Sequence, residues 1–256
     1  MNSIPEHQTS IPGKEEFETE RQAWRNATAE DAELRAIAID FQIACSSHNY
    51  TYQFEWMGVP IIRLPDDVVV LQEIVWNLKP SKIIETGIAR GGSLLLSASL
   101  MSMTNGFANV LGLDLQIFPH TMDAINDSIF ADSIQMWEGD SSSASAVSVV
   151  KKFLGNETNP CLLILDSDHT HSHVLNELNA LAHLLPARSV IMVADTLIEE
   201  LPADFYKDRN WAQGNNPLTA LNEFLSENSE SFEREFKWGR RAVQSEFRDG
   251  IISKTC

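Results

Sequence analysis

Acidic and histidine side chains follow one apolar stretch of this sequence. Residues 163–165 are Leu-Ile-Leu, and a polar segment with two acids and three histidines follows them, namely Asp166, Asp168, His169, His171 and His173. A further acid, Asp195, ends the next apolar run. Adjacent parallel strands lie about 4.8 Å apart, so Asp166 and Asp195 can share one small cation. Since Mg²⁺ prefers oxygen ligands and keeps waters that a substrate oxygen can replace, the pattern predicts a magnesium-like site.

A histidine beside such a cation could remove a proton from a substrate hydroxyl. We expect His169 to be this base, with Asp168 beside it in the site, because His169 directly follows the acids; His171 is the second choice. Two alternatives remain open. The histidines could cap a helix and face solvent, or they could bind zinc, although their spacing does not match HExxH.

A glycine turn connects an expected strand to an expected helix earlier in the chain. Its spacing is neither GxGxxG nor GxxxxGK[ST], which argues against nicotinamide binding and against a phosphate-gripping lysine. Glycines let the backbone approach a ligand closely, and the helix that follows offers unpaired N–H groups. The Glu-x-Gly sequence followed by Gly-Gly-Ser resembles the first motif of class I methyltransferases. The candidate cofactor-binding residues of this turn are Glu85, Gly87, Arg90, Gly91, Gly92 and Ser93.

Polar residues also follow the next two expected strands. Asp114 ends the first of them, where an acid accepts hydrogen bonds from the ribose hydroxyls of a nucleotide cofactor. Asp140 and Ser141 follow the second, and the resemblance implies a contact there on the adenine side. The alternatives are a helix cap at Asp140 or Ser141 and a solvated strand end at Asp114.

These residues require a sheet that brings several strand ends together. Short apolar runs alternate with helical segments, which predicts a parallel α/β sheet with helices on both faces. The expected strands are 82–86, 110–114, 134–137, 162–166 and 190–195, and the expected helices between them are 93–103, 121–130, 142–154 and 173–185. A helix near 218–225 and terminal strands at 232–237 and 251–253 complete the prediction.

The chain divides into three expected parts. Residues 1–14 are expected to be a flexible tail, and residues 15–65 a helical arm (15–46) followed by an aromatic-rich segment (50–65). That segment could pack on the core as a lid, or it could form a substrate or subunit surface. Residues 66–256 are the expected methyltransferase domain, which begins with a helix at 66–78.

Composition limits the partners and the compartment. The net charge of −17 and the lack of clustered Lys and Arg argue against nucleic-acid and anionic-membrane binding. The three cysteines form no CxxC pair, and no apolar run reaches the roughly 20 residues of a membrane span. We therefore expect a cytoplasmic protein whose partner is a small molecule, with aromatic residues in 50–57 and the N-terminal helix suggesting a homo-oligomer.

From residue 50 to its end, the chain resembles the cephalosporin hydroxylase family, whose members resemble class I S-adenosylmethionine-dependent O-methyltransferases. The segments that carry the resemblance are 58–62, 84–87, 91–93, 166–171, 195–196 and 214–217. It implies a Rossmann-like sheet, mostly parallel with an antiparallel C-terminal strand, helices on both faces and an N-terminal helical arm. It also implies S-adenosylmethionine and a divalent metal such as Mg²⁺ held by Asp166 and Asp195.

Two positions depart from the family pattern. Thr196 stands where the similar catechol O-methyltransferases have an amide metal ligand, and Ala194 stands where the antibiotic-pathway member has a further acid. Thr196, Asp168 or water would then complete the metal shell. The expected function is O-methylation of a hydroxyl on a small molecule, either a sugar or a secondary metabolite. A non-catalytic cofactor-binding accessory protein and a hydroxylase remain as alternatives.

Overall fold

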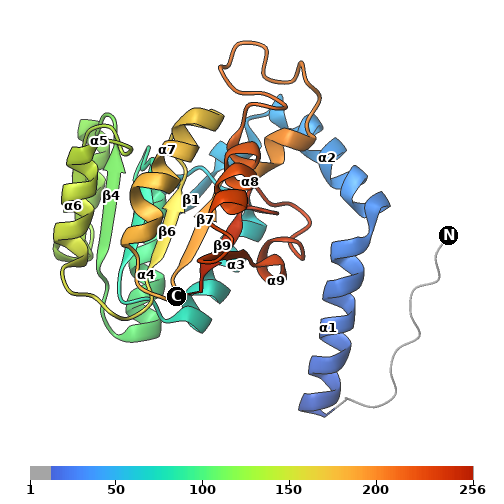
Figure 1. Ribbon diagram of the computed structural model, residues 1–256, viewed down its shortest axis with the longest axis horizontal. Helices are drawn as coiled ribbons and strands as arrows, with labels where there is room; N and C mark the ends of the chain where they lie inside the picture. Colours follow the sequence, from blue (N-terminus) through green and yellow to red (C-terminus); the bar gives the residue numbers. More distant parts are fainter. Residues whose placement is uncertain (1–12, 256) are drawn as a thin grey trace.

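A seven-stranded sheet runs through the centre of the molecule, and the computed structural model describes residues 13–255 (Figure 1). The strand order is β5-β4-β3-β6-β7-β9-β8. Strands β3 to β7 are parallel, whereas β9 is antiparallel to both of its neighbours. The strand bounds are β3 Ile83–Thr86, β4 Val110–Asp114, β5 Ile134–Glu138, β6 Leu162–Leu165, β7 Val190–Val193, β8 Phe232–Arg234 and β9 Ile251–Lys254.

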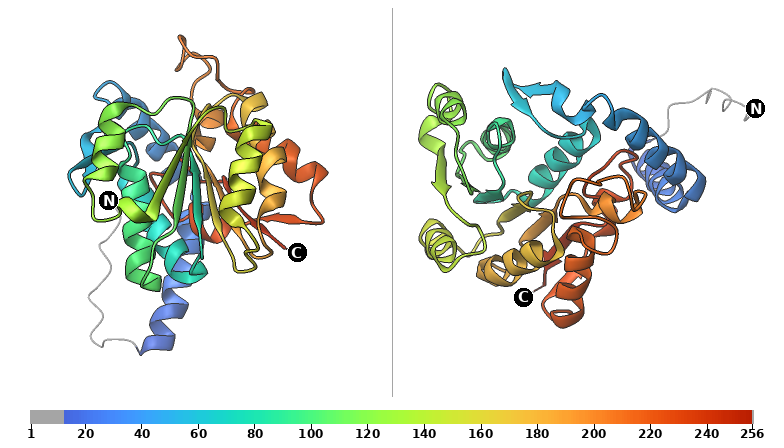
Figure 2. Two further views of the ribbon diagram at one scale, coloured as in Figure 1. Left: turned by 90° about the vertical axis from the view of Figure 1, so that its left-hand side faces the viewer. Right: turned by 90° about the horizontal axis from the view of Figure 1, so that it is seen from above.

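Helices cover both faces of this sheet, as the left view of Figure 2 shows. On one face α3 (Pro65–Leu78), α4 (Gly92–Asn105) and α5 (Pro119–Asn126) enclose one apolar cluster. On the other face α6 (Ala144–Leu154), α7 (His171–Leu181) and α8 (Pro217–Glu227) enclose a second cluster. Strand residues alternate between the two clusters because successive side chains of a strand point to opposite faces. The α/β class, the single antiparallel C-terminal strand and the helices on both faces are thus confirmed.

The N-terminal arm consists of two helices, α1 (Lys14–Glu30) and α2 (Ala32–Ser46). The sequence predicted one helix over 15–46, but Asp31 breaks it. The Asp31 side chain caps α2 by accepting a hydrogen bond from the Leu34 backbone N–H at 2.8 Å. Of the expected tail, residues 1–12 lie outside the described residues, while Lys14 already belongs to α1.

The aromatic-rich segment folds as a one-turn helix, η1 (Tyr50–Gln53), and a hairpin of β1 (Phe54–Trp56) and β2 (Val59–Ile61). Met57 and Gly58 both have positive φ in its two-residue turn, as a tight hairpin turn requires. The hairpin lies against α4, where the Trp56 indole N–H donates to the Ser99 hydroxyl at 3.0 Å. A Cβ atom on Gly92 would lie 2.4 Å from the Pro60 carbonyl oxygen, so this glycine allows the close contact.

One predicted strand is wrong in its second half. The sequence predicted a terminal strand over 232–237, but β8 ends at Arg234 and α9 (Phe236–Gly239) follows. Phe232 is buried against the core, whereas Phe236 is 46% exposed and lies near the Arg240 guanidinium. Short helical turns complete the fold at η2 (Ala131–Ser133), η3 (Ala182–Leu184) and η4 (Thr196–Glu200).

Within residues 13–255, none of the helices combines the length and the apolar character that crossing a bilayer requires.

Candidate active site

A cavity of about 420 Å³ lies at the carboxyl end of the parallel strands. Its walls come from five parts of the chain: α2, the segment from η1 to Arg63, the glycine loop, the ends of β6 and β7, and the segment 197–211 with Glu246. This is the edge at which open α/β sheets bind ligands. Two segments that are far apart in the sequence, the N-terminal arm and residues 197–211, thus line the same cavity.

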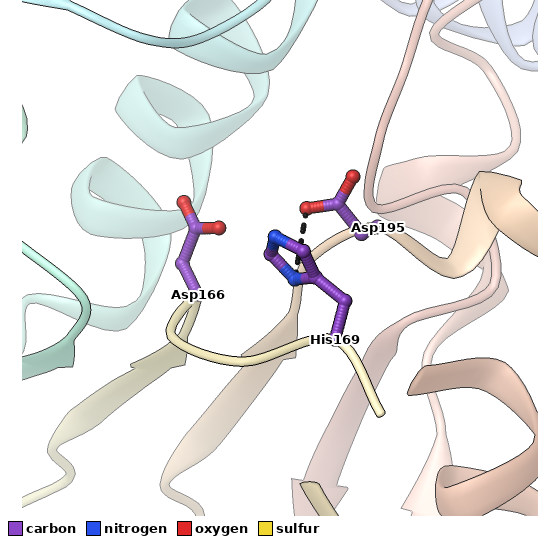
Figure 3. Close-up of side chains that lie close together, drawn as sticks. All are labelled: Asp166, His169 and Asp195. Atoms are coloured by element: carbon purple, nitrogen blue, oxygen red, sulfur yellow. Dashed lines mark ion pairs between the residues drawn. The ribbon is translucent and has the colours of Figure 1, made fainter. Parts of the chain in front are cut away.

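Three ionisable side chains converge in this cavity: Asp166, His169 and Asp195 (Figure 3). One ligand atom of each lies within 4.8 Å of the others. Nδ1 of His169 is 3.3 Å from Oδ2 of Asp195, and the His169 and Trp211 rings are nearly perpendicular, with 4.8 Å between their centroids. Asp166 follows β6 and Asp195 follows β7, so the sequence argument from adjacent strand ends is confirmed for this pair.

Asp195 adopts a left-handed backbone conformation, with φ of 56°. This conformation is unfavourable for a residue with a Cβ atom and is usually held by the surrounding structure. Here Thr196 anchors the turn, because its N–H and its hydroxyl both donate to the Glu246 carbonyl oxygen at 3.0 Å. The Thr196 hydroxyl, expected as a metal ligand, thus donates its proton to the backbone, and His169 lies with the two acids in the cluster.

A buried arginine that the sequence did not reveal lies beneath the three residues. Arg63 is 1% exposed, and its Nη2 atom lies 3.3 Å from Asp166 Oδ2 and 3.4 Å from Glu85 Oε1. Its guanidinium also stacks over the Phe247 ring at 5.0 Å. Arg63 follows the hairpin as an isolated charge in an apolar segment, so no local pattern marked it. It joins the strand of the glycine loop to the strand of the acid cluster.

More carboxylates surround this arginine than its single charge can balance. Burial raises the pKa of Asp166 well above its ordinary range; Arg63 opposes this rise and Asp195 adds to it. Burial likewise raises the pKa of Glu246, and the carboxylates of Asp195, Asp67 and Asp166 raise it further. Burial raises the pKa of Asp67 to about 7, even though the Ser245 hydroxyl donates to it at 2.5 Å.

This excess of negative charge and the converging donor set fit a divalent cation. Like-charged carboxylates that share a site raise one another's pKa, and a bound cation removes that penalty. The oxygen ligands suit Mg²⁺, while the imidazole also suits a transition metal. Among the described residues only one histidine lies in the cluster, so the two-His-one-carboxylate arrangement of non-haem iron oxygenases is not formed there.

The other two histidines of the sequence cluster lie outside the cavity lining. His171 Nδ1 lies 2.8 Å from the Thr219 hydroxyl and its Nε2 3.1 Å from Glu223, so it joins α7 to α8. His173 contacts the buried Glu177 at 3.5 Å, and hydrogen bonding to Glu177 raises its pKa although burial opposes this. Asp168 turns back on its own chain and accepts hydrogen bonds from the N–H and hydroxyl of Thr170.

The glycine loop lies on the other side of the cavity. A Cβ atom on Gly87 would lie 1.9 Å from the Asp166 carbonyl oxygen, and Gly87 also has φ of 79°, so only glycine fits there. Arg90, Gly92 and Ser93 line the cavity with it. No side chain caps the start of α4, which leaves its first N–H groups available to a ligand. Gly91 lies outside the cavity lining and is packed against α5.

Asp114 fixes the shape of this loop. Its Oδ2 accepts hydrogen bonds from the backbone N–H groups of Ile88 at 2.8 Å and Ala89 at 3.2 Å. Its Oδ1 accepts one from Gln116 at 3.1 Å, so a ribose hydroxyl would have to share that oxygen or displace a bond.

The remaining expected cofactor residues are bound to nearby groups. Asp140 accepts hydrogen bonds from the N–H and hydroxyl of Ser142, and these bonds lower its pKa. Ser141 is buried, and its hydroxyl donates to Glu177 at 2.5 Å. Glu85 is buried at the end of β3, where burial raises its pKa and Arg63 opposes this rise. The cavity thus collects only part of the predicted set: Gly87, Arg90, Gly92, Ser93, Asp166, His169 and Asp195.

Two mycobacterial proteins are similar to this chain in sequence. A rhamnosyl O-methyltransferase of Mycobacterium leprae is 28% identical over 147 residues, covering 57% of this chain and 62% of that protein. A rhamnosyl O-methyltransferase of Mycobacterium tuberculosis (strain ATCC 25618 / H37Rv) is 29% identical over 199 residues, covering 75% of this chain and 76% of that protein.

Solved structures share the fold. A CmcI structure with Mg and SAM superimposes with a TM-score of 0.54 at 19% identity, covering 80% of this chain and 78% of that one. MycE methyltransferase from the mycinamycin biosynthetic pathway, in complex with Mg and SAH, gives a TM-score of 0.51 at 16% identity and covers 83% and 54%. The model of the family described as Rhamnosyl O-methyltransferase/CmcI matches residues 48–255, so the chain belongs to that family.

Proposed function

We propose that this chain is an S-adenosylmethionine-dependent O-methyltransferase that uses a divalent cation and acts on a sugar hydroxyl. The observation that carries the proposal is the convergence of Asp166, His169 and Asp195 in the same cavity as the glycine loop. A methyl donor and a group that deprotonates a hydroxyl must lie side by side for this reaction, and holding the reactants in that arrangement supplies much of the rate.

The glycine loop would hold the donor. Its backbone faces the cavity at Gly87, and the uncapped start of α4 offers N–H donors at Gly92 and Ser93. When bound, S-adenosylmethionine supplies an electrophilic methyl group on its sulfonium. Asp114 keeps the loop in the conformation that leaves this backbone exposed to the cavity, since it holds two successive loop N–H groups.

Asp166 and Asp195 would hold Mg²⁺. A bound cation supplies a positive field that lowers the pKa of a coordinated hydroxyl and orients it. Arg63 fixes the Asp166 carboxylate from below, and the Thr196 turn fixes Asp195. Both acids are therefore held before a ligand arrives, which reduces the reorganisation that binding requires.

His169 would take the proton of the acceptor hydroxyl. Its Nδ1 lies beside the Asp195 carboxylate, and an N–H donated there leaves Nε2 unprotonated and able to accept a proton. The Trp211 ring, which lies nearly perpendicular to the imidazole, limits how the imidazole can turn. If His169 instead ligates the cation, its replacement would weaken cation binding, and this outcome separates the two roles.

The acceptor side of the cavity favours a small polyhydroxylated molecule. Tyr52, Tyr206 and Trp211 line this part, so that aromatic faces and phenol groups lie near the acid cluster. The rhamnosyl O-methyltransferase relatives support a deoxyhexose as the acceptor. Cys45 and Cys161 are both free, which suits a reducing compartment, and we therefore propose a cytoplasmic location.

Turnover by the purified full chain tests the proposal. The protein would be incubated with S-adenosylmethionine, Mg²⁺ and a panel of rhamnosides, and products would be identified by a mass gain of one CH₂ group. We expect chelation to abolish turnover, added Mg²⁺ to restore it, and Asp166→Asn to remove turnover while the protein stays folded.

Calorimetric titration of Mg²⁺ into the His169→Ala variant then separates base from ligand. Unchanged cation affinity with lost turnover supports the base. Turnover that survives exhaustive chelation would remove the cation from the mechanism, and calorimetry without any S-adenosylmethionine or S-adenosylhomocysteine binding would refute the function.

A further inference from the structure

Glu177 of α7 is a buried carboxylate that holds two serine side chains from separate loops. It is 0% exposed, and its Oε1 atom accepts hydrogen bonds from the Ser141 hydroxyl at 2.5 Å and from the Ser167 hydroxyl at 2.8 Å. Ser141 follows β5, and Ser167 follows β6. Strands β4 and β3 lie between these two strands in the sheet. One carboxylate therefore joins two loops that are not neighbours along the edge of the sheet.

His173 completes this cluster from the same helix. Its Nε2 atom lies 3.1 Å from the Ser167 hydroxyl oxygen, 3.3 Å from that of Ser141 and 3.5 Å from Glu177 Oε1. Because a carboxylate only accepts hydrogen bonds, both serine hydroxyls give their protons to Glu177, and Nε2 faces three oxygen atoms. We therefore assign a proton to Nε2. The hydrogen bond with Glu177 raises the pKa of His173 although burial opposes this, which agrees with the assignment.

This arrangement decides how the Ser167 hydroxyl can bind a further group. A hydroxyl has one proton to donate and two lone pairs that accept. The Ser167 proton goes to Glu177 and one lone pair faces Nε2 of His173, which leaves one lone pair. Ser167 lines the active-site cavity, so its hydroxyl can offer a ligand only an acceptor. A serine without such partners can rotate and either donate or accept.

Ser167 lies on the glycine-loop side of the acid cluster. A Cβ atom on Gly87 would lie 2.8 Å from the Ser167 Cα atom, so the two loops touch. The Ser167 hydroxyl shares an oxygen of Glu177 with Ser141, which follows β5, whereas Asp195 follows β7 on the other side of β6. The hydroxyl is therefore directed toward the strands that carry the glycine loop.

We propose that Glu177 is a positioning residue that makes Ser167 a fixed hydrogen-bond acceptor for the adenosine part of S-adenosylmethionine. This role rests on the proposed function, because it concerns the recognition of that methyl donor. Adenosine offers two kinds of hydrogen-bond donor, the ribose hydroxyls and the 6-amino group of adenine. Both fit a serine that can only accept. A base with a 6-keto group does not fit, because it presents an acceptor in place of the amino group.

Calorimetry of the full chain with S-adenosylhomocysteine and its analogues tests this role. One analogue lacks the 2′-hydroxyl, one lacks the 3′-hydroxyl, and one carries hypoxanthine in place of adenine. We expect one of them to bind the wild-type protein about three- to tenfold more weakly than S-adenosylhomocysteine because it loses the bond to Ser167. In Ser167→Ala this difference in affinity should largely disappear, whereas the other analogues keep theirs. The analogue that responds identifies the donor group.

Glu177→Gln separates positioning from packing. The amide keeps the size of the carboxylate but adds N–H donors, so the Ser167 hydroxyl becomes free to turn and donate. The same analogue should therefore lose its difference in affinity although Ser167 is present. A merely structural role would weaken all the ligands alike and leave the ratios of their affinities unchanged.

Ser245→Ala is the matched control. Ser245 also donates to a buried carboxylate, that of Asp67 at 2.5 Å, but it lies outside the cavity lining. Its replacement should leave every ratio of affinities unchanged.

Three outcomes would overturn the role of Glu177. In the first, the wild-type protein binds every analogue as tightly as S-adenosylhomocysteine, which needs no variant to establish. In the second, the ratios of affinities stay the same in Ser167→Ala, so the proposed function stands while the contact with Ser167 is wrong. In the third, Ser167→Ala changes a ratio and Glu177→Gln does not, so Ser167 needs no positioning. A wild-type protein that does not bind S-adenosylhomocysteine at all would refute the proposed function as well.

Discussion

The two sides of the cavity use their carboxylates differently. On the glycine side, at the ends of β3 to β5, Asp114 and Asp140 accept hydrogen bonds from nearby backbone N–H groups. On the acid side, at the ends of β6 and β7, Asp166 and Asp195 lie within 4.8 Å of each other, and a buried arginine, Arg63, pairs with Asp166. On the glycine side, hydrogen bonds from the backbone compensate the carboxylates, and those to Asp114 also fix the conformation of the loop. The acid side leaves negative charge unbalanced, which is what a cation or a proton-transfer step requires.

The largest expected effect separates two histidines of the acid side. His169→Ala should lower turnover by about 10²–10⁴-fold, the range for loss of a general base. His171→Ala should change turnover by only a few-fold, because its ring joins α7 to α8 through Thr219 and Glu223. Single-turnover kinetics with saturating donor and cation measures both. A comparable loss at both positions would show that the orientation of the imidazoles does not decide their roles.

Gly87 is the point at which the two sides touch. Gly87→Ala should lower the free energy of unfolding by about 3 kcal/mol or more, because the new methyl group overlaps the Asp166 backbone. Gly106→Ala is the matched control, with φ of 77° against 79° and no atom within 4 Å of the new Cβ. The control should lose only about 1 kcal/mol. Equal losses in urea unfolding would mean that backbone conformation, not the contact between the two sides, makes glycine necessary.

Asp114 tests whether the glycine side acts through its shape. Asp114→Ala removes the acceptor of two loop N–H groups and should weaken S-adenosylmethionine binding by about 1–3 kcal/mol. Asp140→Ala should weaken it less, since the Asp140 carboxylate bonds only Ser142. Calorimetry on both variants measures the difference. A larger loss of affinity for Asp140→Ala than for Asp114→Ala would instead support the direct contact between Asp140 and the cofactor that the sequence suggested.

The smallest expected effect concerns Asp67, whose raised pKa reports on the unbalanced negative charge of the acid side. Its pKa is about 7 in the folded protein, above the ordinary value near 3.9, so the folded state binds more protons than the unfolded state between these pH values. Stability should therefore fall as the pH rises through this window. The free energy of unfolding should fall between pH 5 and pH 7, and Asp67→Asn should make this fall smaller by about 1–2 kcal/mol.

Asp140→Asn is the control for this measurement. Because its pKa is lowered by the Ser142 hydrogen bonds, Asp140 is ionised in both states across the same window, and its replacement should leave the pH slope unchanged. Urea unfolding at several pH values measures the slope. If Asp67→Asn does not alter the pH dependence of the free energy of unfolding, the pKa of Asp67 is not raised and its negative charge is compensated by neighbouring groups.

The sequence by itself determined the sheet and the pair of acids. Apolar runs of about five residues between helical segments predict parallel strands, and the carboxyl ends of such strands meet at one edge. Asp166 and Asp195 could therefore be brought together without coordinates. The glycine loop could also be recognised locally, because a turn from a strand into a helix requires particular residues at fixed positions.

Only the tertiary structure decided which side chains face the cavity. His169, His171 and His173 alternate in sequence, but the turn that Asp168 makes with Thr170 and the start of α7 at His171 send them in different directions. Arg63 and Asp67 come from one segment and Glu246 from another, both far from Asp166 in the chain, and no local pattern marks a charge that will be buried. Side-chain direction beyond a strand end depends on how distant segments pack, and periodicity does not encode that packing.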